Sequence, residues 1–229
     1  MKTVSLIMFA IMILPQQQEK DFAKQREEMV KRQIENRGIK DSATLAAMRK
    51  IPRHLFVPKD QMAHAYEDRP LPIGLGQTIS QPYIVAYMTE VIKPKSNFRV
   101  LEIGSGSGYQ AAVLSEIVKE VYTIEIIEAL GKESGSRLDK LNYKKVQSKT
   151  ADGYHGWKEK APFDAIMVTA AAEYIPPPLI EQLKDGGRMI IPVGSPFMTQ
   201  QLMLIEKTGN KTRTTSLIPV RFVPFKRNQ

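Results

Sequence analysis

The sequence predicts a doubly wound α/β fold with a mixed seven-stranded sheet and an N-terminal helical cap. First, a strand-like run, Val100–Ile103, is followed by glycines at alternate positions (Gly104, Gly106 and Gly108) and then by an apolar helical pattern. Second, another strand-like run, Val121–Ile126, follows that helix. Third, helices and strands continue to alternate along most of the remaining chain. Strand, glycine turn and helix in this order open a nucleotide-binding half-domain.

The region before the glycine turn is predicted to be mainly helical. A helical period runs from Phe22 to Gly38, which ends it, and a second short helix covers Ser42–Lys50. Two prolines in Ile51–Pro58 break the helical pattern. The loop Asp68–Pro82 is so rich in turn residues that we expect neither helix nor ordinary strand there. Tyr83–Ile92 is amphipathic and predicts a helix that leads towards the central strand.

After the glycine turn, the pattern predicts alternating helices and strands. The expected elements are a helix over Ile127–Leu141, strands over Lys145–Lys149 and Phe163–Val168, a helix over Leu179–Lys184, a strand over Met189–Pro192, and a hairpin of Gln201–Glu206 and Thr215–Val220. The near-continuous apolar run Phe163–Val168 is typical of a parallel strand buried on both faces. Gly186-Gly187 is expected to end the helix Leu179–Lys184. Gly209-Asn210 is expected to form the turn of an antiparallel edge hairpin.

Length and composition indicate one ordinary globular domain. The chain has 229 residues, of which 42% are hydrophobic and 25% charged. We expect a single domain over residues 21–229, an apolar extension over residues 1–20, and a monomer. The chain has no cysteine, which excludes disulfides, thiol catalysis and cysteine metal sites. His54, His64 and His155 lack metal-ligand spacing, so we expect no metal and assign these side chains to packing or to the surface.

The charge and the first residues leave some alternatives open. The net charge is +9, and residues 207–229 contain no acid, which suits nucleic acid, an acidic polypeptide substrate or a merely basic surface. Lys2 precedes an apolar run, Leu6–Leu14, that resembles a secretory signal. This run is too short to span a bilayer, and glutamines follow it where a cleavage site needs small residues. We expect a cytoplasmic protein without stable membrane association; export, an upstream start codon or an apolar arm folded onto the domain remain alternatives.

The glycine turn suits S-adenosylmethionine better than a phosphate-bearing nucleotide. The dinucleotide fingerprint needs a small residue three places after its second glycine, where this chain has Tyr109. No Gly-Lys-Ser/Thr follows the turn, so the P-loop pattern is also absent. S-adenosylmethionine has no phosphate, and its carboxylate can face the NH groups at a helix start. Glu125, at the end of the next strand, can accept hydrogen bonds from both ribose hydroxyls.

Other candidate site residues follow the remaining strands or precede a helix. Ligands bind beyond the carboxyl ends of the strands in such sheets, where Asp152 and Thr169–Ala172 also lie. Asp152 either accepts a hydrogen bond from the adenine amino group or is an ordinary turn carboxylate. Ser80, just before the helix Tyr83–Ile92, is either an N-cap or a functional hydroxyl.

Several motifs extend this interpretation to a family. The segments VLEIGSGSGYQAA, RGIKD, IPRHLFVP, LPIGLGQTISQP, LIEQLKDGGRMIIPVG and VRFVP closely resemble bacterial protein-L-isoaspartate O-methyltransferases, from about Phe22 to Phe225. The glycine turn is shared with many methyltransferases, whereas GQTISQP and the Arg-His-Phe-Val-Pro context are more particular to this family. Tyr154-His155 and Pro178 are small departures, and residues 1–20 have no counterpart in the usual family pattern.

The resemblance implies a repair reaction and a set of site residues. The family methylates the free α-carboxyl of L-isoaspartyl or D-aspartyl residues, and the ester then collapses to a succinimide that reopens partly to aspartate. By resemblance, Ser80 is the active-site serine, Thr169 and Ala170 lie beside the substrate, and Arg221–Phe225 close over the pocket. The cofactor-binding residues implied or expected are Thr78, Ile79, Gly104, Ser105, Gly106, Gly108, Glu125, Asp152, Gly153 and Thr169.

The chemistry of this reaction requires no strong base. A carboxylate is already ionised at pH 7, and a sulfonium is a good leaving group. The remaining need is in-line alignment and exclusion of water, and orientation of this kind contributes roughly 7 to 11 kcal/mol. One alternative is a methyltransferase acting on RNA or small molecules, although RNA-stacking aromatics are not found near basic clusters. Another is a non-catalytic adenosyl-binding module, against which the Ile79–Pro82 loop argues. We therefore expect isoaspartyl proteins, and no nucleic acid, as partners.

Overall fold

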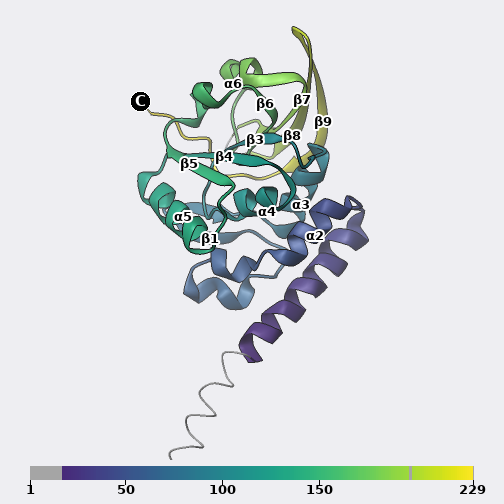
Figure 1. Ribbon diagram of the computed structural model, residues 1–229, viewed down its shortest axis with the longest axis vertical. Coiled ribbons are helices and arrows are strands. Elements are labelled where there is room, and N and C mark those ends of the chain that lie inside the picture. The colour runs from purple at the N-terminus through teal and green to yellow at the C-terminus, as the bar shows by residue number, and fades with distance from the viewer. Residues whose placement is uncertain (1–16, 196–197, 229) are drawn as a thin grey trace, which may run out of the picture.

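The computed structural model describes residues 17–195 and 198–228, and within them a seven-stranded sheet forms the centre of the molecule (Figure 1). Its strand order is β5-β4-β3-β6-β7-β8-β9. The strands are β3 (Arg99–Ile103), β4 (Glu120–Glu125), β5 (Val146–Thr150), β6 (Phe163–Val168), β7 (Leu183–Val193), β8 (Gln200–Thr208) and β9 (Lys211–Val220). β3 to β7 pair in parallel, whereas β8 and β9 are antiparallel. The expected mixed seven-stranded sheet is confirmed.

Helices cover both faces of the sheet, because alternate residues of the buried strands point to opposite sides. On β3, Val100 belongs to the apolar cluster on one face and Leu101 to the cluster on the other. The helices α3 (Pro82–Val91), α4 (Tyr109–Ile117) and α5 (Glu128–Lys140) contribute to the first cluster, and α6 (Pro177–Gln182) contributes to the second. The doubly wound arrangement is therefore present, with α4 packed directly after the glycine turn.

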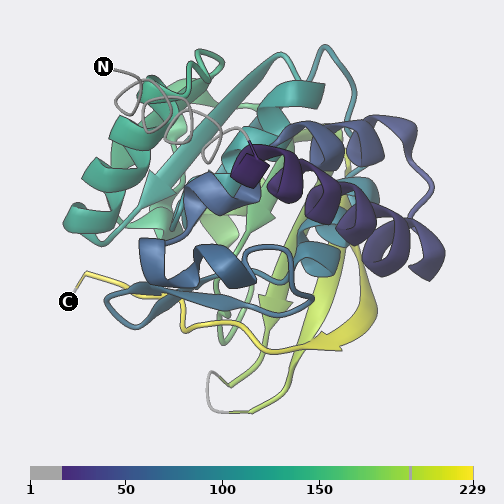
Figure 2. The ribbon, with the colours of Figure 1, turned by 90° about the horizontal axis from the view of Figure 1, so that it is seen from below.

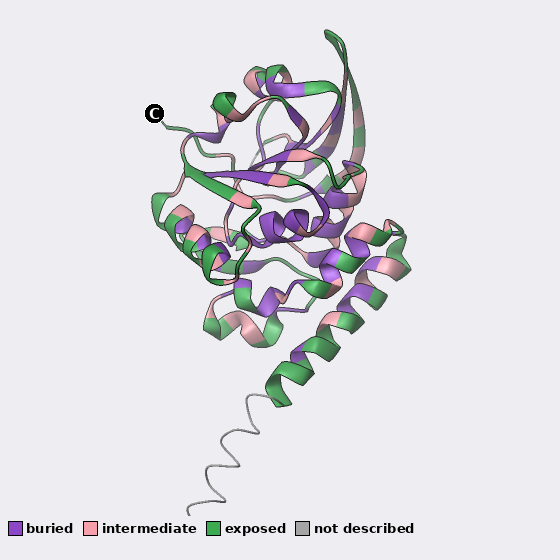
Figure 3. Ribbon diagram, viewed as in Figure 1, coloured by how far each residue is buried: buried purple, intermediate pink, exposed green. Residues whose placement is uncertain are grey.

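The N-terminal cap is helical, as its periodicity predicted. Residues 17–28 form an α-helix that continues through η1 (Met29–Ile34) and η2 (Glu35–Arg37) and ends at Gly38, whose φ is 100°. α2 (Ser42–Lys50) follows, with Asp41 accepting a hydrogen bond from the Thr44 N–H at 2.7 Å. The short helices η3 (Arg53–Phe56) and η4 (Lys59–His64) complete the cap. Buried residues lie along one side of the cap helices, and their outer side is exposed (Figure 3).

Aromatic stacking fixes the first helix to the cap. The Phe22 ring stacks on His54 with their centroids 4.1 Å apart, and His54 Nδ1 lies 2.8 Å from the Tyr66 hydroxyl. His54 is thus a packing residue, as expected, and His64 is exposed beside Glu67. The apolar run Leu6–Leu14 lies outside the described residues, so the expected boundary at residue 20 stays a prediction. Across the part of the chain that is described, each helix is either too short or too polar to cross a membrane.

The loop Asp68–Pro82 differs from the expectation, because it contains a two-stranded hairpin. β1 (Leu71–Gly74) and β2 (Gln77–Ile79) pair antiparallel, and Leu71 and Ile79 are buried opposite each other. Gly74, Leu75 and Gly76 all have positive φ, which closes the turn that links the strands. The dense turn residues therefore mark the tip and edges of a hairpin rather than an irregular loop.

The glycine pair Gly186-Gly187 also differs from the expectation. α6 ends at Gln182, and both glycines lie inside β7, where the pairing of β7 with β6 shifts register. A Cβ on Gly187 would lie 2.8 Å from the Lys184 carbonyl oxygen, so the close backbone approach requires glycine. The final hairpin was predicted correctly: β8 and β9 are joined at Gly209-Asn210 and form the antiparallel edge.

Candidate active site

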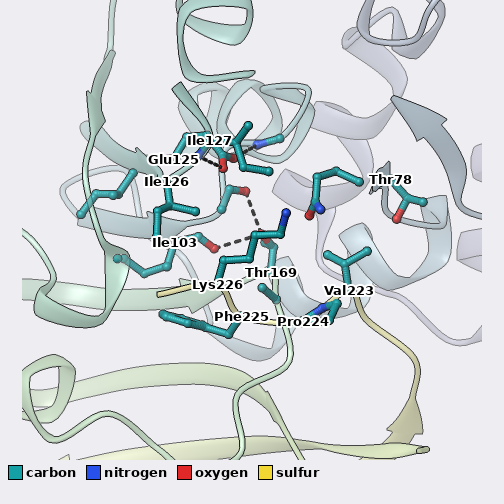
Figure 4. Close-up of a pocket in the computed structure, with 16 residues that line it drawn as sticks. Thr78, Ile103, Glu125, Ile126, Ile127, Thr169, Val223, Pro224, Phe225 and Lys226 are labelled. Carbon is teal, nitrogen blue, oxygen red and sulfur yellow. Dashed lines mark hydrogen bonds between the residues drawn. The ribbon is translucent and has the colours of Figure 1, made fainter. Parts of the chain in front are cut away.

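A pocket lies at the carboxyl ends of β3, β4 and β6, the edge where the sequence placed a ligand. Its walls include Gly104 and Gly106 from the glycine turn, Glu125 from the end of β4, and Thr169 just after β6. The C-terminal segment Val223–Lys226 forms another wall (Figure 4). In Figure 2 this yellow segment runs beside the hairpin β1–β2, which contributes Gln77 and Thr78 to the same pocket.

The glycine turn requires glycine for backbone and for steric reasons. Gly104, Gly106 and Gly108 have φ values of 97°, 51° and 86°, in the left-handed region that other residues rarely adopt. A Cβ on Gly104 would lie 2.5 Å from Thr169 Oγ1. The Thr169 hydroxyl can donate to the Gly104 carbonyl at 2.7 Å or to the Ile103 carbonyl at 3.0 Å. The turn therefore packs tightly against the end of β6. Gly108 serves as the N-cap residue of α4.

Glu125 connects the glycine turn to the second strand. One carboxylate oxygen accepts a hydrogen bond from the Gly106 N–H at 2.8 Å, and the other accepts one from the Ile127 N–H at 3.0 Å. The residue is buried, yet it lines the pocket. Each carboxylate oxygen has further acceptor capacity, so Glu125 can hold the turn and still accept hydroxyl donors.

A second hollow adjoins the first. Its lining includes Ser80, Gln81, Arg221 and Phe222. Thr78, Thr169 and Val223 line both hollows. The two hollows therefore meet at a shared wall, which is the arrangement that transfer of a group between two bound molecules requires.

Ser80 lies in this second hollow and is not an N-cap. α3 begins at Pro82, and its N-cap is Gln81, which makes no side-chain capping bond. The capping alternative for Ser80 is therefore wrong. The Ser80 carbonyl accepts a hydrogen bond from Arg53 at 2.8 Å, and within the described part of the chain its hydroxyl has no hydrogen-bond partner. The hydroxyl is thus available to a ligand.

The remaining expected cofactor residues are distributed unevenly. Gly153 lines the first pocket, whereas Ile79 and Ser105 line a small pocket that adjoins Ser80 and the glycine turn. Asp152 lines neither hollow, because its carboxylate faces the C-terminal segment and accepts hydrogen bonds from Arg227 Nε at 2.9 Å and from the Asn228 N–H at 3.2 Å. Burial opposes the charge of Asp152, but these hydrogen bonds prevail and lower its pKa.

Glu102 belongs to the site and was not anticipated. This residue of β3 is fully buried and lines the same small pocket. The Thr123 hydroxyl donates to one of its oxygens at 2.5 Å, and the other oxygen has no partner among residues 17–195 and 198–228. Burial raises the pKa of Glu102 to about 8, although the bond from Thr123 opposes this rise. A glutamate inside a strand gives no local sequence signal of such a position. In the described residues, no group of three histidine or acidic side chains is arranged to hold a metal ion.

The fold and the two joined hollows define the class of the protein. A glycine turn after the central strand, an acid at the end of the next strand and an adjoining hollow with a free hydroxyl are the features of a doubly wound methyltransferase that uses S-adenosylmethionine.

Comparison with known proteins identifies the family. The family model for protein-L-isoaspartate(D-aspartate) O-methyltransferase matches residues 24–229. A protein-L-isoaspartate O-methyltransferase of Opitutus terrae is 58% identical over 205 residues, covering 90% of this chain and 88% of that protein. One of Shewanella sediminis is 52% identical over 225 residues, covering 97% and 92%. The chain belongs to the protein-L-isoaspartate(D-aspartate) O-methyltransferase family and is an enzyme that uses S-adenosylmethionine.

Solved structures agree with this family. A protein-L-isoaspartate O-methyltransferase superposes with a TM-score of 0.82 and 30% identity, over 89% of this chain and 66% of that one. A Plasmodium falciparum structure, described as a putative protein-L-isoaspartate O-methyltransferase in complex with S-adenosyl-L-homocysteine, has a TM-score of 0.77 and 26% identity, over 89% and 99% of the two chains. The fold expected from the sequence is confirmed by both.

Glu125→Gln tests the role of the carboxylate in ligand binding. The amide keeps the shape of the side chain but removes charge-assisted hydrogen bonds, which contribute roughly 1.5 to 3 kcal/mol each. The dissociation constant of S-adenosylhomocysteine, measured by calorimetry, should rise about tenfold to a hundredfold. Glu120→Gln, at the other end of β4, is the control and should leave it unchanged. An unchanged constant in Glu125→Gln would exclude the ribose-binding role.

Glu102→Gln tests whether the buried acid is neutral in the native protein. Because the pKa of Glu102 is about 8 in the folded protein and about 4.5 for an ordinary glutamate, the stabilising effect of the protonated acid is fully present below about pH 4.5. This contribution is lost as the pH rises through 8. Glutamine does not ionise and does not lose this contribution. As the pH rises from 5 to 9, the free energy of unfolding of the variant should therefore increase by on the order of a few kcal/mol relative to that of the wild type. Urea unfolding at several pH values measures this, with exposed Glu159→Gln as control. Parallel curves for wild type and Glu102→Gln would show that Glu102 is ionised in the fold.

Proposed function

We propose that the first pocket holds S-adenosylmethionine and that the second hollow holds the α-carboxylate of an isoaspartyl residue, so that the methyl group passes between them. The observation that carries this proposal is the shared wall of Thr78, Thr169 and Val223, with the free Ser80 hydroxyl on the substrate side. The family makes L-isoaspartyl and D-aspartyl sites of damaged proteins the substrates.

The residues of the first pocket fit the parts of this cofactor. Glu125 would accept hydrogen bonds from the ribose hydroxyls, since it lines the pocket and each of its oxygens has acceptor capacity to spare. Gly104 and Gly106 leave room for the methionine end, and the small pocket beside them is lined by Glu102, whose carboxyl group would accept a hydrogen bond from the ammonium group. Gly153 would lie at the adenine. We retain Asp152 as an adenine-side residue, acting beside its bonds to the C-terminal segment.

The reaction needs alignment more than acid or base catalysis. S-adenosylmethionine supplies an electrophilic methyl group on a sulfonium. Ser80, together with backbone NH groups of its loop, would hold the substrate carboxylate so that one oxygen faces that methyl group. The carboxylate is ionised at neutral pH, so no proton has to move before the O–C bond forms and the C–S bond breaks. Thr169 and Val223, which line both hollows, would exclude water from their junction when both molecules are bound.

We also propose where and with what the enzyme works. A cytoplasmic location accords with a chain that has no cysteine, since disulfides are rare in that compartment. We further propose a monomer that acts on polypeptides, the substrates that the family implies, and not on nucleic acid. Fractionation of the native cells tests the location; recovery of the protein outside the cytoplasmic fraction would contradict it.

Labelled S-adenosylmethionine tests the activity directly. The protein should transfer label to an isoaspartyl peptide, and not to the same peptide with ordinary aspartate or to bulk RNA. The label should be released slowly as methanol, because the product ester collapses to a succinimide. Label on RNA, or equal label on both peptides, would contradict the proposal.

Ser80→Ala tests the substrate-holding hydroxyl. A lost hydrogen bond to an anion should lower turnover roughly tenfold to a hundredfold, from 1.5 to 3 kcal/mol. Stability should change little, because Ser80 caps no helix. Turnover is measured at saturating cofactor and normalised to folded protein. The control is Ser115→Ala, which removes a buried hydroxyl bonded to the Ala112 carbonyl in α4. Wild-type turnover in Ser80→Ala would exclude the role.

A further inference from the structure

Arg53 is a buried cation that has no carboxylate partner among the residues that the structure describes. The residue is fully buried, and its Nε donates to the Ala65 carbonyl at 2.8 Å. One terminal nitrogen, Nη2, donates to the Ser80 carbonyl at 2.8 Å, and the other, Nη1, has no partner in the described part of the chain. The guanidinium also lies over the Tyr109 ring, 4.9 Å from its centroid. Three segments of the cap and the site therefore converge on one side chain.

Stability alone does not explain this arrangement. Removal of a guanidinium from water is costly, and among the described residues the Arg53 nitrogens contact backbone carbonyls rather than a carboxylate that would offset this cost. Burial lowers the pKa of Arg53 to about 10, so the group still carries its charge at neutral pH. Apolar side chains of similar volume in such positions are often as stabilising as the buried ion or more so. Because packing does not require a charged side chain here, a role of the Arg53 guanidinium in the neighbouring site explains why the charge is present.

The contact with Ser80 has a direct consequence for the second hollow. Ser80 lies between β2 and α3, where Ile79 pairs with Leu71 and the Gln81 carbonyl accepts the first helical bond from Val85. The bond from Arg53 holds the remaining carbonyl of this junction. A charged donor on that carbonyl also polarises the peptide between Ser80 and Gln81, which strengthens the following N–H as a donor. Both Ser80 and Gln81 line the hollow.

We infer that Arg53 is a positioning residue for methyl transfer, which acts through the Ser80 carbonyl to fix the loop that holds the substrate carboxylate. This inference rests on the proposed role of Ser80. Transfer between two bound molecules is sensitive to alignment, and a displacement of about 1 Å costs up to roughly a hundredfold in rate. Arg53 lines neither the first pocket nor the small pocket, so its replacement is expected to change cofactor affinity much less than turnover.

Two substitutions separate the charge from the geometry. Arg53→Met keeps an apolar side chain of similar length and removes every donor. Arg53→Lys keeps the charge but cannot reproduce the forked bonds to the Ala65 and Ser80 carbonyls. Arg188→Met is a matched control, because Arg188 donates to the Val91 carbonyl at the other end of the same helix, α3, away from the hollow.

The readouts are turnover and KM with an isoaspartyl peptide, and affinity for S-adenosylhomocysteine, all per folded molecule. Arg53→Met should lower kcat at least tenfold and change the affinity for S-adenosylhomocysteine less than threefold. The kcat of Arg53→Lys should lie between that of Arg53→Met and that of the wild type. Arg188→Met should stay within twofold of the wild-type kcat. In a double-mutant cycle with Ser80→Ala, the Arg53 substitution should lower kcat much less than it does in the wild type, since Arg53 is inferred to act by positioning the hydroxyl that Ser80→Ala removes.

The outcomes distinguish this inference from the function on which it rests. If Ser80→Ala is slow but a folded Arg53→Met has the wild-type kcat, the inference about Arg53 is overturned and the proposed function is not. If Arg53→Met does not fold, a folded Arg53→Lys with the wild-type kcat has the same meaning. Equal losses in kcat and in cofactor affinity, or a similar loss in Arg188→Met, show a merely structural role and also overturn it. Wild-type turnover in Ser80→Ala overturns both proposals.

Discussion

The site depends first on one carboxylate that joins two strands of the sheet. Glu125 is at the end of β4, and its bonds to the N–H groups of Gly106 and Ile127 hold the glycine turn against the neighbouring strand. The turn cannot relax away from this position, because Thr169 occupies the space where Gly104 lacks a side chain. Three chain segments are thereby fixed around one pocket before any ligand binds. Preorganised polar groups of this kind do not have to be reoriented during the reaction.

Two buried ionisable residues near Ser80 show where the fold retains costly groups. Glu102 has an oxygen without a partner, and Arg53 has a nitrogen without one, within the residues that the structure describes. Most other buried positions of the sheet are apolar, and buried polar residues such as Thr123 and Gln200 have hydrogen-bond partners. Unsatisfied polar groups are expensive and few in native proteins, so their presence near a site indicates a function other than packing.

Sequence patterns predicted the sheet, its helices and most of the first pocket, because periodicity and glycine turns are local signals. Val100–Ile103 and Phe163–Val168 read as buried strands, and the acid at the end of β4 follows from its place after the turn. The hairpin β1–β2 was missed because its glycines and prolines obscure the short apolar alternation. Ser80 was consistent with capping until the helix start was known. Arg53 and Glu102 were not found, since their contacts are with residues distant in sequence, which no local pattern records.

The C-terminal segment has a consequence for the synthesis of the enzyme. Ala171, just after β6, exchanges backbone hydrogen bonds at 2.8 Å with Val223 and Phe225, and these bonds place the segment against the pocket. Arg227 then secures the segment on Asp152 and over the Tyr154 ring. During translation the glycine turn, Glu125 and Ser80 leave the ribosome long before these residues. A nascent chain can therefore pack its central parallel strands and still lack one wall of its cofactor pocket, so the complete pocket forms only after Val223–Arg227 have emerged.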